Sequence, residues 1–469
     1  MNWLMNAVFP PINQCPLRYH SLFQPEQPAL LLDQQPVSYQ QLDRLVEQCR
    51  QKLAHQNMGK ERHLAVIARN PVDTLIFALA CLREKIVFCP VNPAFPEQQR
   101  QQYYQRINTT LVVESSGVSM GEEPVKIKSL EPVFIDPESI MSLIATSGTS
   151  GTPKAVAHSY SNHYFNAVGS HHQMPLSSGD HWLLSLPLFH VGGFAIIIRC
   201  LLAGATMVVE TEKGSLEQVL MSTPVTHLSL VNTQLYRLLS QGLNLYELGV
   251  RTILLGGGIA SPDLVNKALS QGLRLLTTYG MTEMASQVCT GHPRFNDRGV
   301  TSGELLPGRD LTLSASGEIW VRGKPLAMGY YQQGSLIPLV DKEGWYHTGD
   351  QGAWYQGQLQ VMGRIDNMFI SGGENIHPEE VERALAALPG VIQSVVVPVT
   401  SQEFGQRPVA YVETVDGTVD ESFTKRHLAG KIAKFKVPDR ILPFPEDMVH
   451  TGIKVNRRFF QQRVQNKDY

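Results

Sequence analysis

A loop rich in glycine and hydroxyl groups, closed by a lysine, follows a short apolar run. The apolar run covers residues 140–145, and the loop reads TSGTSGTPK over residues 146–154. Glycine lets the backbone approach a ligand closely, and hydroxyls and a lysine add donors for anionic oxygens. It is not a Walker loop, because Pro153 stands where that motif needs a glycine before the lysine. The residues predict a polyphosphate cradle, and a solvated Ser/Gly linker is the alternative for the same composition.

Three more polar stretches lie further along the chain. They read YGMTE at residues 279–283, YHTGD at residues 346–350 and GRIDNMFISGGENIHPEEVE at residues 363–382. Taken singly they say little, because YGMTE also suits a strand end with a capping Thr/Glu pair and TGD is a common turn. Their order along one chain is what makes them informative.

The elements that would position these stretches alternate between strand and helix. A capping-box pattern at Ser38 and Gln41 opens an early helix. Buried strands are predicted at residues 64–68, 86–90, 182–186, 205–209, 227–231, 252–255 and 273–277, and helices at residues 72–85, 192–202, 216–222, 233–241 and 261–271. This alternation favours a parallel sheet with crossover helices, whose ligands bind at the carboxyl ends of the strands.

The pattern changes twice towards the C-terminus. From about residue 299, short alternating strands with glycine turns predict a β-rich module. After residue 366, a helix beginning at Pro378, strands at residues 395–399 and 409–414, and a helix near residues 422–434 predict a compact α+β unit. We therefore expect an α/β fold with a large N-terminal domain of parallel-sheet α/β subdomains plus a β-rich module (residues 1–365). A small α+β C-terminal domain (residues 366–469) follows it.

Composition excludes several classes of partner. Lysine plus arginine (40) nearly balances aspartate plus glutamate (42), so that no basic field attracts nucleic acid or anionic lipid. The six cysteines are scattered without a CxxC pair, which is typical of buried thiols in a reducing compartment. The N-terminus has no signal-peptide pattern, and the most apolar span, residues 194–209, carries Arg199 and falls short of a membrane helix. We expect a cytoplasmic protein that acts on small molecules.

With the four stretches in this order, the chain resembles the adenylate-forming acyl-CoA synthetase superfamily from about residue 140 onward. The resemblance implies an enzyme that uses ATP and Mg²⁺ to adenylate a carboxylic acid and then transfers the acyl group to coenzyme A. The transition state of adenylation gathers negative charge, so lysines, hydroxyl donors and a divalent cation suit it. The resemblance also implies a mobile C-terminal domain that swings between two poses.

The resemblance assigns the nucleotide site. The residues expected to bind ATP are Thr146, Ser147, Gly148, Thr149, Ser150, Gly151, Thr152, Lys154, Gly257, Gly258, Tyr279, Gly280, Asp350 and Arg364. Thr282 is expected to contact a phosphate oxygen and Glu283 to bind Mg²⁺. Asp350 would accept both ribose hydroxyls, because a carboxylate has two oxygens suited to a diol.

The resemblance also implies roles for two residues of the C-terminal part. Asp366 aligns with the hinge residue. The catalytic lysine of the adenylation pose matches Lys454 in the stretch HTGIKVNRR, where Ile453 replaces the glycine of the family pattern. A solvated terminal lysine is the alternative for Lys454, and Lys154 is left as a charge that anchors the loop or faces the phosphates.

The acyl pocket is expected along residues 185–193, 231–239 and 256–260, including Gly256. His190 aligns with the residue at the carboxylate entrance, although a packed strand-end histidine would read the same. These stretches look similar to the branch that activates an aromatic keto diacid in menaquinone synthesis. The second carboxylate of a diacid needs a cation, and Arg237 is the candidate unless its helix turns it to solvent. The alternatives are a CoA ligase for another aryl or medium-chain acid and a nucleotide-binding regulator without turnover.

Overall fold

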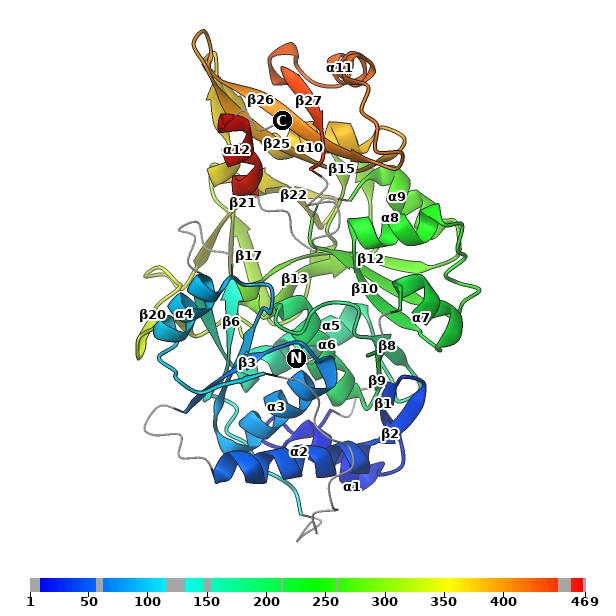
Figure 1. The fold of residues 1–469 in the computed structure, drawn as a ribbon, viewed down its shortest axis with the longest axis vertical. Helices are drawn as coiled ribbons and strands as arrows, with labels where there is room; N and C mark the ends of the chain where they lie inside the picture. The colour runs from blue at the N-terminus through cyan, green and yellow to red at the C-terminus, as the bar shows by residue number, and fades with distance from the viewer. Residues whose placement is uncertain are drawn as a thin grey trace.

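The computed structural model describes residues 9–55, 62–114, 131–146, 153–211, 214–258, 260–445 and 457–466. Figure 1 shows a large N-terminal part below and a smaller group of C-terminal strands and helices above it. The predicted α/β class, with an α+β unit at the C-terminus, is confirmed. Within the described ranges, no helix is both long and apolar enough to cross a membrane.

One mixed sheet carries the ends of the glycine-rich loop. In sheet order its strands are β20 (Ser335–Ile337), β19 (Gly329–Gln332), β7 (Lys154–Ser159), β6 (Ile140–Thr146), β4 (Val87–Val91), β3 (His63–Ile67) and β5 (Val112–Glu114). The pairs among β3, β4, β5 and β6 are parallel, whereas β7 pairs antiparallel with both β6 and β19. The loop therefore joins two antiparallel neighbours.

A second sheet carries the YGMTE stretch. In sheet order its strands are β16 (Glu304–Leu305), β13 (Ser286–Gly291), β12 (Arg274–Met281), β11 (Thr252–Gly256), β10 (His227–Val231), β8 (His181–Leu183), β9 (Thr206–Val209), β1 (Pro28–Leu32) and β2 (Gln35–Ser38). The series from β9 through β8, β10 and β11 to β12 is parallel, as predicted. At the far side β12 pairs antiparallel with β13.

Helices of the N-terminal part pack on and between these sheets. They are α1 (Pro16–Phe23), α2 (Tyr39–Ala54), α3 (Pro71–Glu84), α4 (Glu97–Arg106), α5 (Tyr160–Gln173), α6 (Val191–Ala203), α7 (Leu216–Ser222), α8 (Asn232–Ser240) and α9 (Pro262–Leu269). The capping box predicted at Ser38 and Gln41 is confirmed at the start of α2, where each side chain bonds the other residue's backbone N–H.

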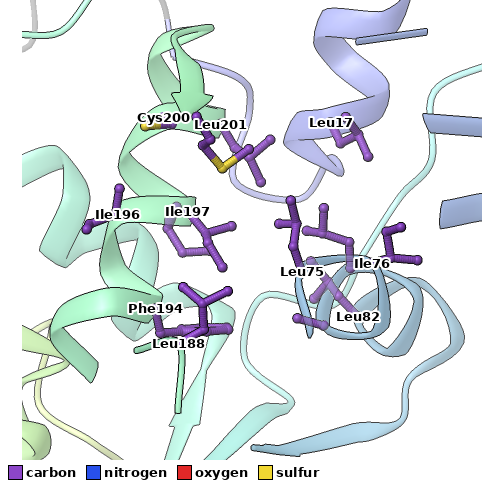
Figure 2. Packing of buried hydrophobic residues seen from close by; sticks show 14 of the residues in the cluster. Leu17, Leu75, Ile76, Leu82, Leu188, Phe194, Ile196, Ile197, Cys200 and Leu201 are labelled. Carbon is purple, nitrogen blue, oxygen red and sulfur yellow. The ribbon is translucent and has the colours of Figure 1, made fainter. Parts of the chain in front are cut away.

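The largest apolar cluster fixes α6. Figure 2 shows Ile197 and Leu201 of α6 facing Leu75 of α3, with Leu17 of α1 beside them. All of these side chains are buried. Because dense packing of this kind resists movement, α6 is a rigid support for the residues of its first turn and for the side chains on its buried face.

A small antiparallel sheet joins the two parts. Its order is β17 (Arg309–Leu313), β18 (Glu318–Gly323), β21 (Tyr346–Tyr355) and β22 (Gln358–Arg364). The YHTGD stretch opens β21, and Asp350 pairs in register with Arg364 of β22. The chain then enters a single turn, η3 (Ile365–Asn367), that contains the predicted hinge residue Asp366.

The C-terminal elements form their own sheet and apolar clusters. The strands are β24 (Glu374–Ile376), β23 (Phe369–Ser371), β26 (Gly405–Thr414), β25 (Val391–Ser401) and β27 (Arg440–Pro443), and the helices are α10 (Pro378–Ala386), α11 (Glu421–Ala429) and α12 (Arg457–Gln465). In Figure 1 this unit lies next to α8 and α9. The domain boundary between residues 365 and 366 stays a prediction.

Several predicted lengths are wrong. The strands expected at residues 395–399 and 409–414 are longer, as β25 (Val391–Ser401) and β26 (Gly405–Thr414). The strand expected at residues 182–186 is β8 (His181–Leu183). The strand expected at residues 273–277 runs to Met281, because pairing with β13 continues it. The helix expected at residues 422–434 ends at Ala429, where Gly430 follows, and residues 434–436 form a separate turn. The extension of β12 matters most, because it places the YGM residues inside a strand.

Candidate active site

The two ends of the glycine-rich loop are held side by side. Thr146 closes β6 and Lys154 opens β7, and the two residues face each other in the ladder. The candidate residues Ser147, Gly148, Thr149, Ser150, Gly151 and Thr152 lie outside the described residues. The ammonium nitrogen of Lys154 lies 4.5 Å from the ring centre of Tyr330. The lysine therefore rests on an aromatic face, an arrangement that stabilises a cation.

Tyr330 links Lys154 to Glu283. The Tyr330 hydroxyl donates to Glu283 Oε1 at 2.8 Å and lies 3.2 Å from the Tyr346 hydroxyl. Burial, and after it the charge of Glu283, raises the pKa of both Tyr330 and Tyr346. Both phenols therefore stay protonated, and the structure brings Lys154, Glu283 and these two donors together.

The Glu283 carboxylate fits a magnesium ion that is shared with a nucleotide. Within the described residues no group of three His, Cys, Asp or Glu side chains could enclose a metal ion. Mg²⁺ typically takes one or two protein carboxylates and completes its shell with substrate phosphates and water. One carboxylate beside the ends of a candidate phosphate loop is such a donor set.

A second cluster joins Tyr279, Asp350, Arg364 and Asp366. The Tyr279 hydroxyl donates to Asp350 Oδ2 at 2.7 Å, and Arg364 Nη1 donates to Asp350 Oδ1 at 3.0 Å. Arg364 Nη2 reaches both oxygens of Asp366, at 3.2 and 3.1 Å. Burial, and then the Asp350 charge, raises the pKa of Tyr279. One guanidinium thus spans the predicted ribose ligand and the predicted hinge residue.

Glycines let strand ends come close beside this cluster. A Cβ on Gly280 would lie 1.9 Å from the Ser286 carbonyl oxygen, and one on Gly256 would lie 2.8 Å from Thr278 Cγ2. Gly257 has φ +83°, which favours glycine. Gly258 follows it as an exposed residue, and position 259 lies outside the described residues.

Replacement of Gly280 by alanine is expected to lower both the melting temperature and the adenylation rate. The added Cβ meets a backbone oxygen at 1.9 Å, and neither strand can yield without breaking its ladder. Overpacking of this kind costs about 1–3 kcal/mol. Thermal denaturation and ATP–pyrophosphate exchange measure the two effects. An alanine variant with wild-type stability would contradict the tight approach of β12 and β13.

His190 and Arg237 lie on different elements from the clusters above. His190 is exposed and directly precedes α6. Arg237 is on α8, with a side chain 40% exposed, and its Nη2 lies 3.7 Å from Glu413 Oε1 of β26. Glu413 is only 6% exposed in its side chain. The cation predicted to face the acid substrate therefore has a carboxylate partner in the C-terminal unit.

Arg199 is a site candidate that the sequence reasoning missed. It lies on α6, is 3% exposed, and burial lowers its pKa to about 10. Its Nη2 reaches Ser286 Oγ at 3.3 Å and Asn166 Oδ1 at 3.5 Å. Among the ion pairs of the described residues it has no carboxylate partner, and its Nε has no hydrogen-bond acceptor there. A buried cation without an anion is unstable unless a ligand supplies one.

Arg309 is a second buried arginine in the same region. Burial, together with the charge of nearby Arg199, lowers its pKa to about 9. Its donors are used by three backbone carbonyls, those of Gln287 (2.8 Å), Pro307 (2.7 Å) and Asn166 (3.3 Å). Arg309 thus has a structural role, whereas Arg199 has N–H donors that remain available to bind an anion. The only sign of Arg199 in the sequence was its position as an arginine within the apolar run of residues 194–209.

Comparisons with known proteins agree with this geometry. The family profile described as "AMP-binding enzyme" matches residues 18–331, and that of the "AMP-binding enzyme C-terminal domain" matches residues 380–453. The 2-succinylbenzoate–CoA ligase of Salmonella typhimurium is 37% identical over 96% of this chain and 97% of its own length. The enzyme of the same name from Escherichia coli is 37% identical over 96% of this chain and 98% of its own length.

Solved structures give the same picture. An arginine-to-lysine variant of E. coli MenE with bound OSB-AMS has a TM-score of 0.86 and 34% identity, covering 98% of this chain and all of that one. The o-succinylbenzoate CoA synthetase of Bacillus subtilis in complex with ATP and magnesium ion has a TM-score of 0.81 and 27% identity, covering 92% of this chain and 96% of that one.

Proposed function

Because the chain belongs to the AMP-binding enzyme family, we propose that it is a 2-succinylbenzoate–CoA ligase of menaquinone biosynthesis. One carboxylate of the acid attacks the α-phosphate of ATP and releases pyrophosphate. The thiol of coenzyme A then displaces AMP from the acyl-adenylate and forms the thioester. The protein works in the cytoplasm on small molecules, without nucleic acid.

Buried Arg199 is the observation that supports this substrate. 2-Succinylbenzoate is a diacid, so one carboxylate reacts while the other must be held in an otherwise apolar site. The guanidinium of Arg199 is buried, has unused donors and reaches Ser286, just past the turn that carries Thr282 and Glu283. A bidentate arginine–carboxylate pair supplies both affinity and orientation. Arg237 keeps its predicted role as the competing candidate, and variants of the two residues separate them.

In this proposal the glycine-rich loop and the turn of Thr282 and Glu283 bind the phosphates of ATP. Residues 146–154 hold the leaving phosphates, with Lys154 as a flanking charge. Thr282 would contact a phosphate oxygen, and Glu283, whose Oε1 accepts from Tyr330, would hold Mg²⁺. The magnesium ion, when bound, neutralises charge on the phosphates. Asp350 and Arg364 hold the ribose, and Tyr279 with Gly256, Gly257 and Gly258 borders the adenine.

The C-terminal part completes the site. Residues 366–469 act as a mobile domain that turns about Asp366 relative to residues 1–365. Lys454, which lies outside the described residues, supplies the cation of the adenylation pose. His190 stands at the entrance for the reacting carboxylate. Two poses let one chain run two reactions with different nucleophiles.

ATP–pyrophosphate exchange with a panel of acids tests the function. We expect exchange with 2-succinylbenzoate and far less with monoacid analogues that lack one or the other carboxylate. Exchange with benzoates or fatty acids, but not with the diacid, would show a CoA ligase of another specificity. Absence of exchange with every acid would support the nucleotide-binding regulator instead.

A further inference from the structure

The turn that carries Thr282 and Glu283 has a strained backbone. Residues 282–284 form a single 3₁₀ turn, η2 (Thr282–Met284), between β12 and β13. Directly after it Ala285 has φ +51° and Ser286 has φ +121°. Residues with side chains rarely adopt such angles, which cost free energy and persist only where the surroundings hold them. The contacts that hold this turn therefore decide where the Glu283 carboxylate lies.

Three neighbours hold the turn by three successive carbonyl groups. His158 Nε2 lies 2.7 Å from the Thr282 oxygen. The backbone N–H of Ala327 donates to the Glu283 oxygen at 2.8 Å, and Asn166 Nδ2 donates to the Met284 oxygen at 2.9 Å. His158 is the tether that comes from β7, the strand that begins at Lys154. The hydrogen bond of His158 therefore joins β7, which follows the candidate phosphate loop, to the turn that carries Glu283, the proposed metal ligand.

The bond from His158 has one chemical form. A carbonyl oxygen only accepts, so Nε2 carries the proton and donates. His158 is fully buried, and burial lowers its pKa to about 4. The ring is therefore neutral at ordinary assay pH, and this donor is present throughout that range.

We propose that His158 is a positioning residue for the magnesium ligand. Its hydrogen bond to the Thr282 carbonyl keeps the strained turn in the form that directs the Glu283 carboxylate to the cation and the phosphates. The proposal rests on the proposed function, in which Glu283 binds Mg²⁺. Without that donor, the Thr282 carbonyl keeps only the N–H of Ala285, at 3.0 Å within the same turn, and nothing from β7 holds the turn in place.

The test separates metal binding from catalysis. In the first measurement Mn²⁺ replaces Mg²⁺, and its binding is followed by electron paramagnetic resonance in the presence of a non-reacting ATP analogue. In the second, the rate of adenylation is measured as a function of the Mg²⁺ concentration. His158→Leu is expected to weaken Mn²⁺ binding about tenfold, the size that loss of one buried hydrogen bond supports, and to raise the Mg²⁺ requirement equally. His158→Gln places an amide donor near the Nε2 position and should restore both values.

His163 supplies a matched control. It is equally buried, its ring centre lies 4.9 Å from that of His158, and its Nε2 bonds Ser142 Oγ at 3.0 Å instead of the turn. His163→Leu should lower the melting temperature without moving the Mn²⁺ affinity. Equal shifts in the two leucine variants would overturn the proposal, as would a glutamine variant that behaves like leucine.

Two more variants keep the proposal testable if His158→Leu does not fold and test the role of Glu283 separately. If His158→Leu does not fold, His158→Asn carries the test, because its shorter amide does not reach the carbonyl and should show the same weakened binding. If neither variant folds, the residue is structural and the proposal fails. Glu283→Gln tests the proposed function separately: unchanged Mn²⁺ binding in that variant refutes Glu283 as the ligand, whatever His158 does.

Discussion

Replacement of Arg199 by methionine is expected to raise the melting temperature while it lowers kcat/KM for 2-succinylbenzoate. Methionine keeps an unbranched apolar stem and removes a buried charge that has no carboxylate partner among the described ion pairs, so the unliganded protein gains stability. The substrate loses a buried, charge-assisted partner, worth a factor of about 10²–10³. Thermal denaturation without ligand and steady-state kinetics measure the two changes.

Two matched arginine variants make this result specific. Arg237→Met removes a cation that is partly exposed and near Glu413, so kcat/KM for the diacid should change little. Arg309→Met removes the hydrogen bonds to three backbone carbonyls, of which that of Gln287 keeps a second donor from Asn166, and should lose stability. A monoacid analogue should react equally with wild type and Arg199→Met if it lacks the carboxylate that Arg199 holds. A lower melting temperature for Arg199→Met with an unchanged KM would show a structural role, and a large KM effect for Arg237→Met would restore the first candidate.

Replacement of Lys454 by alanine is expected to abolish adenylation and to spare the second half-reaction. A cation that stabilises the charge on the reacting phosphate acts only while pyrophosphate is leaving, and removal of one such donor costs about 10²–10³ in rate. Thioester formation from supplied acyl-adenylate does not use that cation. ATP–pyrophosphate exchange and the release of AMP from supplied adenylate measure the two steps.

Lys436 offers the control for this variant. It is a lysine of the same C-terminal part, and its ammonium pairs with Glu380 at 2.7 Å. Lys436→Ala removes a charge from that part without touching the proposed chemistry, so both half-reactions should persist. Equal loss of both steps in Lys454→Ala would refute its assignment to one pose.

The order of local patterns predicted most of the architecture. The strands from β8 to β12 are short apolar runs between helices, so their type and parallel order follow from the sequence. The site clusters around Glu283 and Asp350 follow from motifs that are contiguous in the chain. Tyr330 could not be predicted in the same way, because a separate strand, β19, brings it between Lys154 and Glu283.

The residues that were missed depend on long-range packing. Arg199 is unusual only because α6 is buried against α5 and β13, and no local pattern reports the solvation of a side chain. The bond from His158 to Thr282 joins residues 124 positions apart. The end of β12 was misplaced for a related reason: its last residues pair with β13, and tertiary pairing extended a strand beyond its apolar run.

The double grip of Arg364 on Asp350 and Asp366 has a thermodynamic consequence. If Asp350 receives the ribose and Asp366 is the pivot, the nucleotide and the rotating domain compete for the donors of one guanidinium. A ligand that redirects those donors changes the free energy of rotation. Reciprocity then requires the rotation to change the affinity for that ligand by the same factor. The release of AMP and the return of the domain would then be two measures of one coupling energy.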